Sequence, residues 1–383
     1  MSTHDFDVVV FGGGMVGAAA ALGFAEQGYK IAIVEPVLPK EIEPDAEPEL
    51  RVSAISLGSE QLLKELGAWQ YLLNQRVQAY KQLSVWEMPQ AKTQFDCEQV
   101  QVSWLGHIME NLNLQLALHK ALKRFETQLT WFTCGEVIDA ELGLCNLDGK
   151  QHSTSLVVAA DGGFSAVRRS VELGETGWQY QQKVLSVNIR THERSLAHTF
   201  QQFSESGPMA YLPLFDHFAT LVWYHDANRV DELMKLNKSQ LKAQLLSSFP
   251  ALHSDFEILQ QGCFPIRRNH ANQYYKGRVV LCGDAAHNIN PLAGQGVNIG
   301  FQDVKALLQV NPNLALQSQL AGYEKARRKE NTFMMSAMDA FNLAFCDSNP
   351  ILKGIRNVGL FLAERSGPLK TIALKRALGV DKI

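Results

Sequence analysis

Three short runs of apolar residues mark buried strands along the chain. They cover residues 6–11, 31–35 and 156–160 and are rich in valine, isoleucine and alanine. A continuous apolar run is typical of a strand that is buried on both faces of a parallel sheet. Residues 15–27 have the apolar spacing of a helix, and Gly28 provides a stop. The first part of the chain therefore predicts a βαβ unit with a right-handed crossover.

The middle of the chain shows a different pattern, in which apolar and polar residues alternate. Between about residues 180 and 270, segments such as 210–214 and 219–224 have the two-residue period of an antiparallel sheet. The last hundred residues have mainly helical spacing. The other expected elements are helices over 56–69 and 111–125, a buried strand over 278–282, and a helix that starts near Gly296.

These changes of pattern predict a parallel-sheet domain into which a mostly antiparallel domain is inserted. Residues 36–50, with four prolines and five acidic side chains, are interpreted as a solvated loop rather than an acidic binding tail. The expected boundaries are 1–75, 106–179 and 276–345 for the parallel-sheet domain, 76–105 and 180–275 for the inserted domain, and 346–383 for a helical C-terminal segment.

Composition excludes several classes of protein. The 383 residues are 46% hydrophobic and 20% charged, which is ordinary for a globular protein, and the net charge of −3 argues against a nucleic-acid binder. The six cysteines lack the close spacing of a disulfide framework or metal site, so we assign no metal. Residues 8–25 are uncharged, but three consecutive glycines interrupt them, and residues 1–7 lack lysine and arginine. We therefore expect no membrane span or secretory signal, and a cytoplasmic location.

The first chemical motif is Gly12-x-Gly14-x-x-Gly17, which lies between the first strand and its helix. The first glycine permits a tight turn, the second lets the backbone approach a pyrophosphate, and the third lets helix and strand pack closely. The helix N-terminus also favours phosphate. Glu35 closes the next strand near the spacing of a ribose-binding acid, which suits FAD or NAD rather than NADP.

Two further motifs follow predicted strands. Residues 161–168 read Asp-Gly-Gly-Phe-Ser-Ala-Val-Arg, and residues 283–287 read Gly-Asp-Ala-Ala-His, with Pro-Leu-Ala-Gly-Gln-Gly-Val-Asn following at 291–298. The glycine motif and these two motifs follow one another in the order typical of the class A flavoprotein monooxygenases. The chain therefore resembles that class over essentially its whole length. The resemblance implies a para-hydroxybenzoate hydroxylase-like fold, with a Rossmann-like FAD-binding domain, an inserted mostly antiparallel substrate domain and a helical C-terminus.

Within that class, the ubiquinone-biosynthesis hydroxylases are most similar. Residues 51–56, 66–69 and 290–298 resemble that group in general, whereas residues 178–180, 207–216 and 221–224 resemble its bacterial demethoxyubiquinol hydroxylases. This resemblance implies that FAD and molecular oxygen hydroxylate the ring of a polyprenylated quinol. It also implies NAD(P)H or a reductase as electron donor, a biosynthetic complex as partner, and peripheral contact with the inner membrane, where such a substrate resides.

The resemblance also implies roles for particular residues. Asp284 would hold the ribityl hydroxyls of FAD, Arg51 would lie near the flavin or its phosphates, and Asn111 stands where Arg or Gln is more usual. The backbone of residues 294–298 would face the flavin ring. The full set of cofactor-binding candidates is Gly12, Gly14, Met15, Val16, Gly17, Glu35, Arg51, Asn111, Asp161, Gly162, Asp284, Gly294, Gly296, Val297 and Asn298. The candidates for the substrate pocket are Tyr211, Pro213, Trp223 and Pro291, and no catalytic side chain is assigned.

Several alternatives remain open at this stage. Asp284 is also in place to cap a helix, Arg168 to form a surface ion pair, and His287 to pack the turn after the last strand. A flavin-dependent halogenase is disfavoured because no two tryptophans are two residues apart. Another ring hydroxylase of the same pathway, or a non-catalytic flavin-binding subunit, would fit the same motifs.

Overall fold

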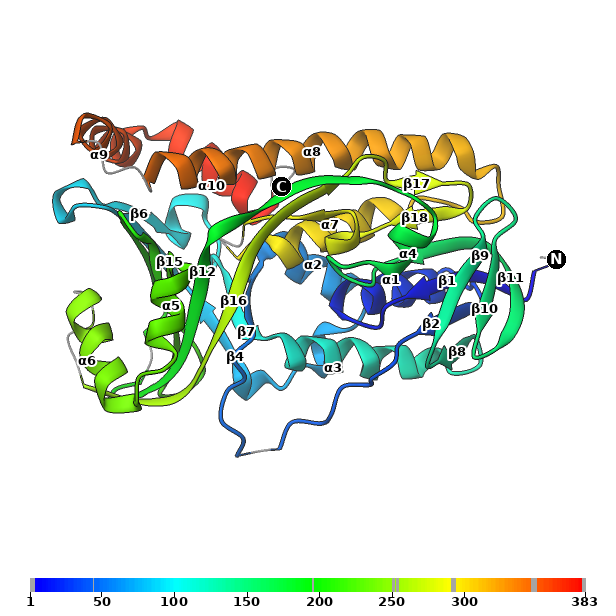
Figure 1. The fold of residues 1–383 in the computed structure, drawn as a ribbon, viewed down its shortest axis with the longest axis horizontal. Helices are drawn as coiled ribbons and strands as arrows, with labels where there is room; N and C mark the ends of the chain where they lie inside the picture. Colours follow the sequence, from blue (N-terminus) through cyan, green and yellow to red (C-terminus); the bar gives the residue numbers. More distant parts are fainter. Residues whose placement is uncertain are drawn as a thin grey trace.

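Two eight-stranded sheets lie toward opposite ends of the molecule, and a smaller three-stranded sheet lies between them (Figure 1). The structure, a computed structural model, describes residues 4–43, 45–194, 196–249, 252, 255–290, 294–345 and 350–380. The arrangement confirms the expected fold class, in which an antiparallel sheet is inserted into a parallel-sheet domain.

The first sheet has the strand order β17-β18-β11-β1-β2-β8, with parallel pairing throughout except between β17 and β18. Its strands are β1 (Phe6–Phe11), β2 (Ile31–Val34), β8 (Leu129–Phe132), β11 (Lys150–Ala159), β17 (Tyr275–Lys276) and β18 (Val279–Leu281), with β9 (Gly135–Asp139) and β10 (Leu144–Leu147) extending β11. The expected buried strands are thus confirmed.

Three helices pack around this sheet: α1 (Met15–Glu26), α3 (Asn111–Leu122) and α7 (Gly296–Leu307). Helix α1 carries four consecutive alanines at 18–21, all fully buried. Small side chains let α1 approach α3 and α7 closely, so the carboxyl ends of β1, β11 and β18 come together beside the N-termini of α1 and α7.

The second sheet has the order β19-β16-β12-β15-β14-β13-β5-β6, and only the β13–β5 pair is parallel. Its strands are β5 (Gln82–Trp86), β6 (Thr93–Asp96), β12 (Glu175–Thr191), β13 (His198–Ser204), β14 (Gly207–Pro213), β15 (Phe218–Asp226), β16 (Phe256–Ala271) and β19 (His287–Asn288). Two helices that the sequence pattern did not indicate, α5 (Ala227–Leu233) and α6 (Lys238–Ser248), cover one face of this sheet. The other face is turned toward the first domain (Figure 1).

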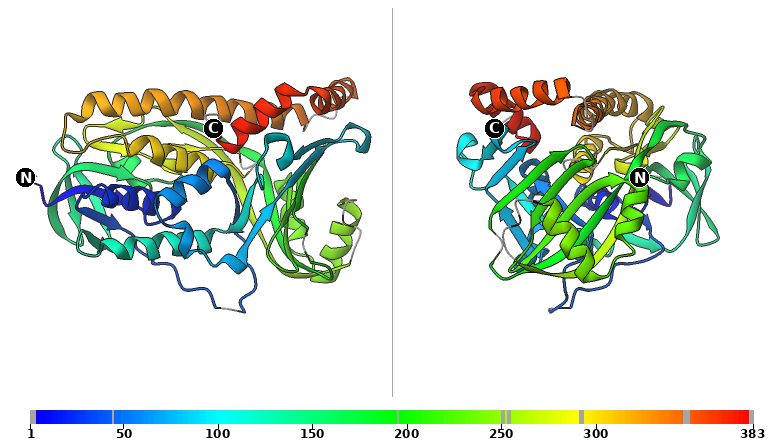
Figure 2. Two further views of the ribbon diagram at one scale, coloured as in Figure 1. Left: turned by 180° about the vertical axis from the view of Figure 1, so that it is seen from behind. Right: turned by 60° about the vertical axis from the view of Figure 1, so that its left-hand side comes forward.

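The smaller sheet joins β3 (Val52–Ser56), β7 (Gly106–Glu110) and β4 (Val77–Tyr80), with α2 (Leu57–Glu65) following β3 and α4 (Ala166–Ser170) following β11. The C-terminal part is helical, as expected, with α8 (Leu316–Phe345), α9 (Pro350–Arg365) and α10 (Pro368–Leu378). Helix α8 runs along much of the molecule, and α9 lies over the end of the second sheet (Figure 2). None of the helices in the described part of the chain is both long and apolar enough to cross a bilayer.

Candidate functional site

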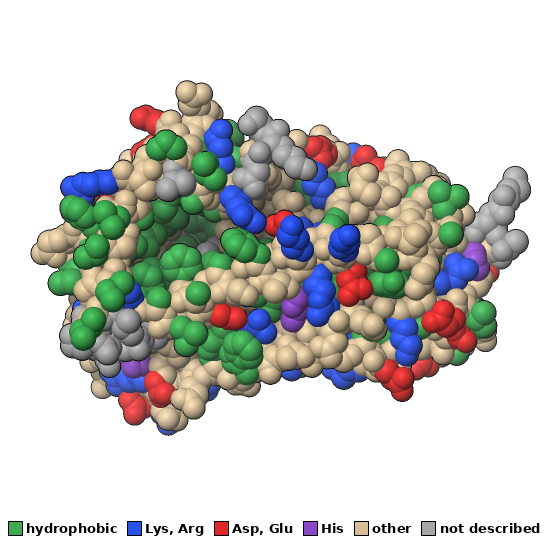
Figure 3. All heavy atoms as spheres, turned by 90° about the horizontal axis from the view of Figure 1, so that it is seen from above, with side chains coloured by type: hydrophobic (Ala, Val, Ile, Leu, Met, Phe, Trp, Pro, Cys, Tyr) green, Lys and Arg blue, Asp and Glu red, His purple; other side chains and the backbone are tan. Residues whose placement is uncertain are grey.

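A cavity of about 1310 Å³ lies between the two large sheets and is lined by residues from both domains. Its first end is formed by the glycine turn after β1 and the start of α7, and its second end by strands β12 to β15 and helix α10. A hollow with hydrophobic side chains in and around it is visible on the face that carries the C-terminal helices (Figure 3).

The turn between β1 and α1 has the shape that a bound pyrophosphate requires. Gly12 has φ +99°, and a Cβ there would collide with the carbonyl of Ala160, while a Cβ at Gly17 would collide with the carbonyl of Gly12. A Cβ at Gly14 would instead meet nothing within 4 Å, and Gly14, Met15 and Val16 all line the cavity. No side chain caps the N-terminus of α1. Free N–H groups therefore face a space that only a glycine leaves open, which fits FAD.

Glu35 lies against this turn and fixes its shape. One carboxylate oxygen accepts the N–H of Gly13 at 2.6 Å, and the other accepts that of Val37 at 3.2 Å. From α3, Gln115 and His119 each donate to the carbonyl of Gly13, at 3.0 and 2.7 Å. Burial lowers the pKa of His119, so its ring is neutral with the donated proton on Nε2. Neither Gln115 nor His119 belongs to a recognisable motif, so the sequence alone does not indicate this role.

Asp284 lies in the turn after β18 and faces the cavity. In the described part of the chain its carboxylate accepts no hydrogen bond, although Arg51 lies near enough to attract it. The surrounding protein raises the pKa of Asp284 by desolvation, against the attraction of His287 and Arg51. A cavity-facing carboxylate without a protein donor fits the hydroxyls of a ribityl chain, and it does not cap a helix.

The turn after β11 is tied to the turn after β18. Asp161 accepts the N–H groups of Ala166 and Val167 at the start of α4, while Gly162, with φ +82°, lines the cavity. Arg168 is 2% exposed, donates to the carbonyls of Ala285 (2.6 Å) and Gly163 (3.1 Å), and pairs with Glu175 (2.6 Å). Arg168 therefore fastens the two turns together rather than forming a surface ion pair.

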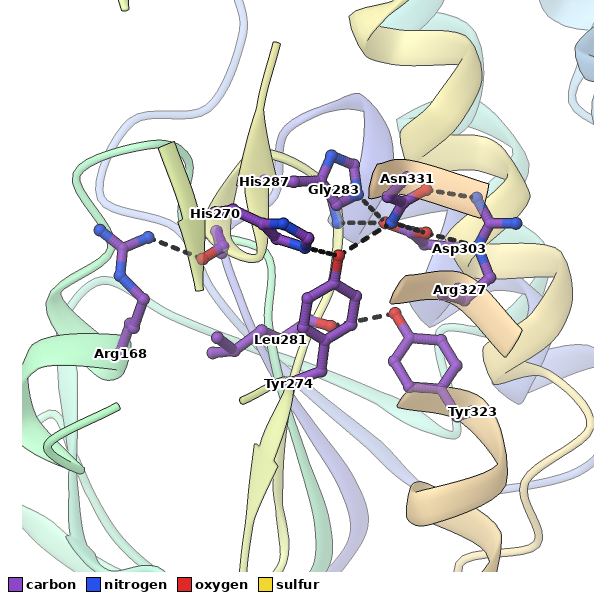
Figure 4. A network of polar contacts seen from close by, with 11 residues as sticks. Arg168, His270, Tyr274, Leu281, Gly283, His287, Asp303, Tyr323, Arg327 and Asn331 are labelled. Carbon is purple, nitrogen blue, oxygen red and sulfur yellow. Dashed lines mark hydrogen bonds and ion pairs between the residues drawn. The ribbon is translucent and has the colours of Figure 1, made fainter. Parts of the chain in front are cut away.

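A buried polar network stabilises the turn after β18 on the side that faces away from the cavity (Figure 4). Asp303 of α7 is fully buried; its carboxylate accepts the N–H of Gly283 at 3.1 Å, contacts His287 Nε2 at 2.5 Å, and pairs with Arg327 Nε at 2.7 Å. Asn331 of α8 also donates to it at 3.2 Å. Burial alone would raise the pKa of Asp303, but His287 and Arg327 lower it to about 2. His287 therefore packs and anchors the turn.

The same network extends to the second sheet. Asn331 donates to the hydroxyl of Tyr274 at 3.1 Å, and that hydroxyl lies 2.6 Å from Nε2 of His270, at the end of β16. Burial and the nearby arginines lower the pKa of His270 to about 4, so its ring is neutral at neutral pH and its Nε2 shares a hydrogen bond with the Tyr274 hydroxyl. One continuous set of hydrogen bonds thus connects the cofactor turn, the long helix α8 and the second sheet.

The start of α7 forms part of the cavity wall beside β3. Gly294, Gly296 and Val297 line the cavity, and the N-terminus of α7 has no side-chain cap, which leaves its N–H groups available. Asn298 instead turns back, accepting from the N–H of Ser56 (2.9 Å) and donating to the carbonyl of Ala54 (2.8 Å). Its side chain fastens α7 to β3.

Asn111 lines the cavity, as expected, with its Oδ1 accepting from Ser53 at 2.7 Å. Arg51 lines the cavity too, packed over the ring of Phe264. The first end of the cavity thus brings together most of the cofactor candidates, whereas Gly12, Gly17, Glu35, Asp161 and Asn298 shape the walls behind it.

The predicted substrate pocket requires a correction. Strands β14 and β15 turn Ala210, Leu212, Val222 and Tyr224 into the cavity. Their neighbours take the opposite face, as the two-residue period of a strand requires. Tyr211 and Trp223 pack in the core beneath α5 and α6, Pro213 is buried outside the cavity lining, and Pro291 lies outside the described residues. Aromatic residues occur on both faces of this sheet because both faces are covered, so an aromatic side chain alone does not identify the cavity face.

The second end of the cavity is mainly apolar. Two tyrosines, Tyr80 and Tyr224, carry the phenols of this wall, and burial raises the pKa of Tyr80 to about 12 and that of Tyr224 further. Both phenols therefore stay neutral. Six further residues line this end of the cavity and were not predicted from the sequence: Leu83, Leu105, Ile108, Phe200, and, from α10, Leu374 and Leu378. Only the contacts of the folded chain bring them together.

The chain resembles flavoproteins in both sequence and structure. The FAD binding domain family matches residues 5–336. The 3-demethoxyubiquinol 3-hydroxylase of Escherichia coli (strain K12) is 38% identical over 99% of this chain and 100% of that protein. The mitochondrial ubiquinone biosynthesis monooxygenase COQ6 of Homo sapiens is 31% identical over 95% of this chain and 91% of its own length. The structure of p-nitrophenol 4-monooxygenase from Pseudomonas putida DLL-E4 matches with a TM-score of 0.76, covering 98% of each chain at 17% identity, and shows the shared fold.

Replacing Gly14 with valine is expected to abolish FAD retention while leaving the fold intact. The backbone at Gly14 has φ −67°, which any residue adopts, so the new side chain would simply fill the open space beside the helix N-terminus. The ratio of FAD to protein after gel filtration measures the effect. Gly322→Val, at an exposed glycine of α8 that also faces open space, is the matched control and should keep its FAD. Full FAD occupancy in folded Gly14→Val would remove Gly14 from the site.

Replacing Asp284 with alanine should weaken FAD binding about ten- to a hundredfold. The reason is the loss of a charge-assisted hydrogen bond, which is worth on the order of 1.5–3 kcal/mol. Fluorescence titration of the apoprotein with FAD gives the dissociation constants. Equal constants for the variant and the parent would show that Asp284 contributes nothing to cofactor binding.

Asp303→Asn should lower the free energy of unfolding by about 3–5 kcal/mol, since it leaves Arg327, whose side chain is only 11% exposed, without its charged partner. The low pKa of Asp303 adds stability above the unfolded-state value of about 3.9, and this stability is lost as the pH falls toward 2. Denaturant unfolding at several pH values between 2 and 5 should therefore show a shallower pH dependence in the variant. The exposed control Asp45→Asn should change stability by less than about 0.5 kcal/mol. An unchanged pH profile for Asp303→Asn would contradict this assignment.

Proposed function

The chain belongs to the FAD binding domain family, and from this premise we propose that it acts as a 3-demethoxyubiquinol 3-hydroxylase. It is an FAD-dependent monooxygenase, with molecular oxygen as co-substrate. The proposed substrate is a 2-polyprenyl-3-methyl-6-methoxy-1,4-benzoquinol. The observation that carries the proposal is the single cavity that runs from the glycine turn to an apolar end between the two domains.

The cofactor end of the cavity supplies groups suited to each part of FAD. The N-terminus of α1 beside Gly14 would hold the pyrophosphate, Asp284 the ribityl hydroxyls, and the N-terminus of α7 the ring. FAD supplies the oxygen chemistry when it is bound and reduced. The protein's part is to bind the quinol ring beside the flavin and exclude water. Tyr80 and Tyr224, as neutral phenols, are able to orient the ring hydroxyls by hydrogen bonds.

The substrate end favours an apolar molecule with few polar groups. Leu83, Leu105, Ile108 and Leu212 contribute to its wall, and such a surface suits an isoprenoid chain better than a polar acid. NAD(P)H or a reductase would donate the electrons, and the protein would work with other enzymes of ubiquinone biosynthesis in the cytoplasm, in peripheral contact with the inner membrane.

Two alternatives share these features. The first alternative is another ring hydroxylase of the same pathway, and the observation that supports it is the 31% identity with the human COQ6 monooxygenase. A non-catalytic flavin-binding subunit of a biosynthetic complex would retain the cofactor end without turnover.

Quinone profiling of a strain that lacks this protein separates these functions. The proposed activity predicts loss of ubiquinone and accumulation of the demethoxy intermediate, with recovery by the parent gene and none by the Gly14→Val gene. Accumulation of a different intermediate would assign the protein to another hydroxylation step. Oxygen consumption by the purified, FAD-loaded protein with a reduced quinol then distinguishes an enzyme from a binding subunit, because the subunit would yield no hydroxylated product.

A further inference from the structure

Helix α9 has an unusual arrangement in which the polar side faces the protein and the apolar side faces outward. Arg356 and Asn357 are each 8% exposed and bind the buried carboxylate of Glu87, at 2.6 and 2.7 Å. Glu364 accepts the N–H of Gln94 from β6 at 2.8 Å. The polar groups of α9 are therefore used to attach the helix to the second domain.

The outward side of α9 carries a continuous apolar stripe. Ile351, Ile355, Val358 and Leu362 follow one another at intervals of four, three and four residues, the spacing of one helix face. Each is between 58% and 74% exposed, and Phe361 beside them is 43% exposed. A helix that turns such a face away from its own protein is suited to an apolar partner.

We propose that this α9 stripe, residues 351, 355, 358, 361 and 362, docks the enzyme on a lipid bilayer with α9 lying in the interface. A helix of this kind inserts its apolar side chains between headgroups and keeps its polar side on the protein. The stripe exposes five side chains of on the order of 100 Å² each, about 500 Å², which is less than the roughly 800 Å² per partner of a stable protein interface.

The position of α10 connects this surface to the cavity. Helix α10 contacts α9, and its Leu374 and Leu378 line the apolar end of the cavity, while Ile372 on the same helix is 61% exposed. An isoprenoid chain could thus pass from lipid into the cavity beside α10. This part of the inference rests on the proposed function, because only a membrane-resident substrate needs such a route.

The attraction to lipid is mainly apolar rather than electrostatic. Four basic residues of the C-terminal segment are held in ion pairs: Lys353 with Glu205, Arg356 with Glu87, Lys370 with Glu364 and Arg376 with Glu330. Arg365 is exposed at the end of the stripe and stacks on Phe361, 3.6 Å from its ring centre, and Lys375 is half-buried. Arg365 is therefore placed to meet anionic headgroups at the end of the stripe.

Co-sedimentation of the FAD-loaded full chain with vesicles of phosphatidylcholine and phosphatidylglycerol tests the proposal. The double variant Ile355→Glu/Leu362→Glu should lower the partition constant at least tenfold, and binding of the parent should persist in 0.5 M salt. Val37→Glu/Leu142→Glu adds the same charge at two exposed apolar positions, one just after β2 and one between β9 and β10, and should bind like the parent. These strands lie far from α9 (Figure 1). Equal binding of all three proteins, or no binding of the parent, would overturn the proposal.

Two further measurements separate this inference from its rivals. If light scattering shows a dimeric parent that binds no vesicles and a monomeric α9 variant, the stripe joins two copies of the chain and the lipid proposal is wrong. Turnover of a short-tailed, water-soluble quinol should be equal in the parent and the α9 variant, whereas turnover of a long-tailed quinol in vesicles should fall in the variant. Vesicle binding with no turnover of either quinol would refute the proposed function and leave the docking inference standing.

Discussion

The buried carboxylate of Asp303 determines where the cofactor end of the cavity can form. A fully buried charge is tolerated only when its hydrogen bonds are satisfied, and four groups from two separate segments, the turn after β18 and helix α8, converge on this one. Because one of the four is the N–H of Gly283, the turn that carries Asp284 cannot shift without leaving the carboxylate incompletely bonded. The position of Asp284 thus depends on the Asp303 carboxylate, which bonds the backbone of the same turn.

The other walls of the site are also held in place by polar side chains that bond to neighbouring backbone groups. Arg168 joins the turns after β11 and β18, Glu35 shapes the glycine turn from the end of β2, and Asn298 ties α7 to β3. They hold backbone N–H groups and a carboxylate in position, which is the preorganisation that a cofactor-binding site needs.

Much of the fold and the cofactor end could be predicted from the sequence, because glycine motifs record backbone requirements directly. Gly12 and Gly17 tolerate no side chain, and the order of the three motifs identified the family before any contact was known. The substrate end was less accessible. The alternating pattern located β14 and β15 but did not reveal that Trp223 points to α5 and α6 while Tyr224 points to the cavity. Nor does the sequence show that basic residues of the C-terminal segment, such as Lys353 and Arg356, pair with acids distant in sequence.

Strands β12 and β16 place a mechanical limit on the molecule. They pair from Glu175 with Ala271 to Thr191 with Phe256. The ribbon that begins beside Arg168 thus continues, through irregularities near Gln179 and Asn188, to the far end of these strands in the second sheet. A two-stranded beam of about 17 residues, roughly 55 Å long, resists bending where both strands are bonded to each other. Opening and closing the cavity by swinging one domain against the other would strain this beam. Such a swing would therefore have to bend the ribbon where its pairing is interrupted, between Gln179 and Lys183.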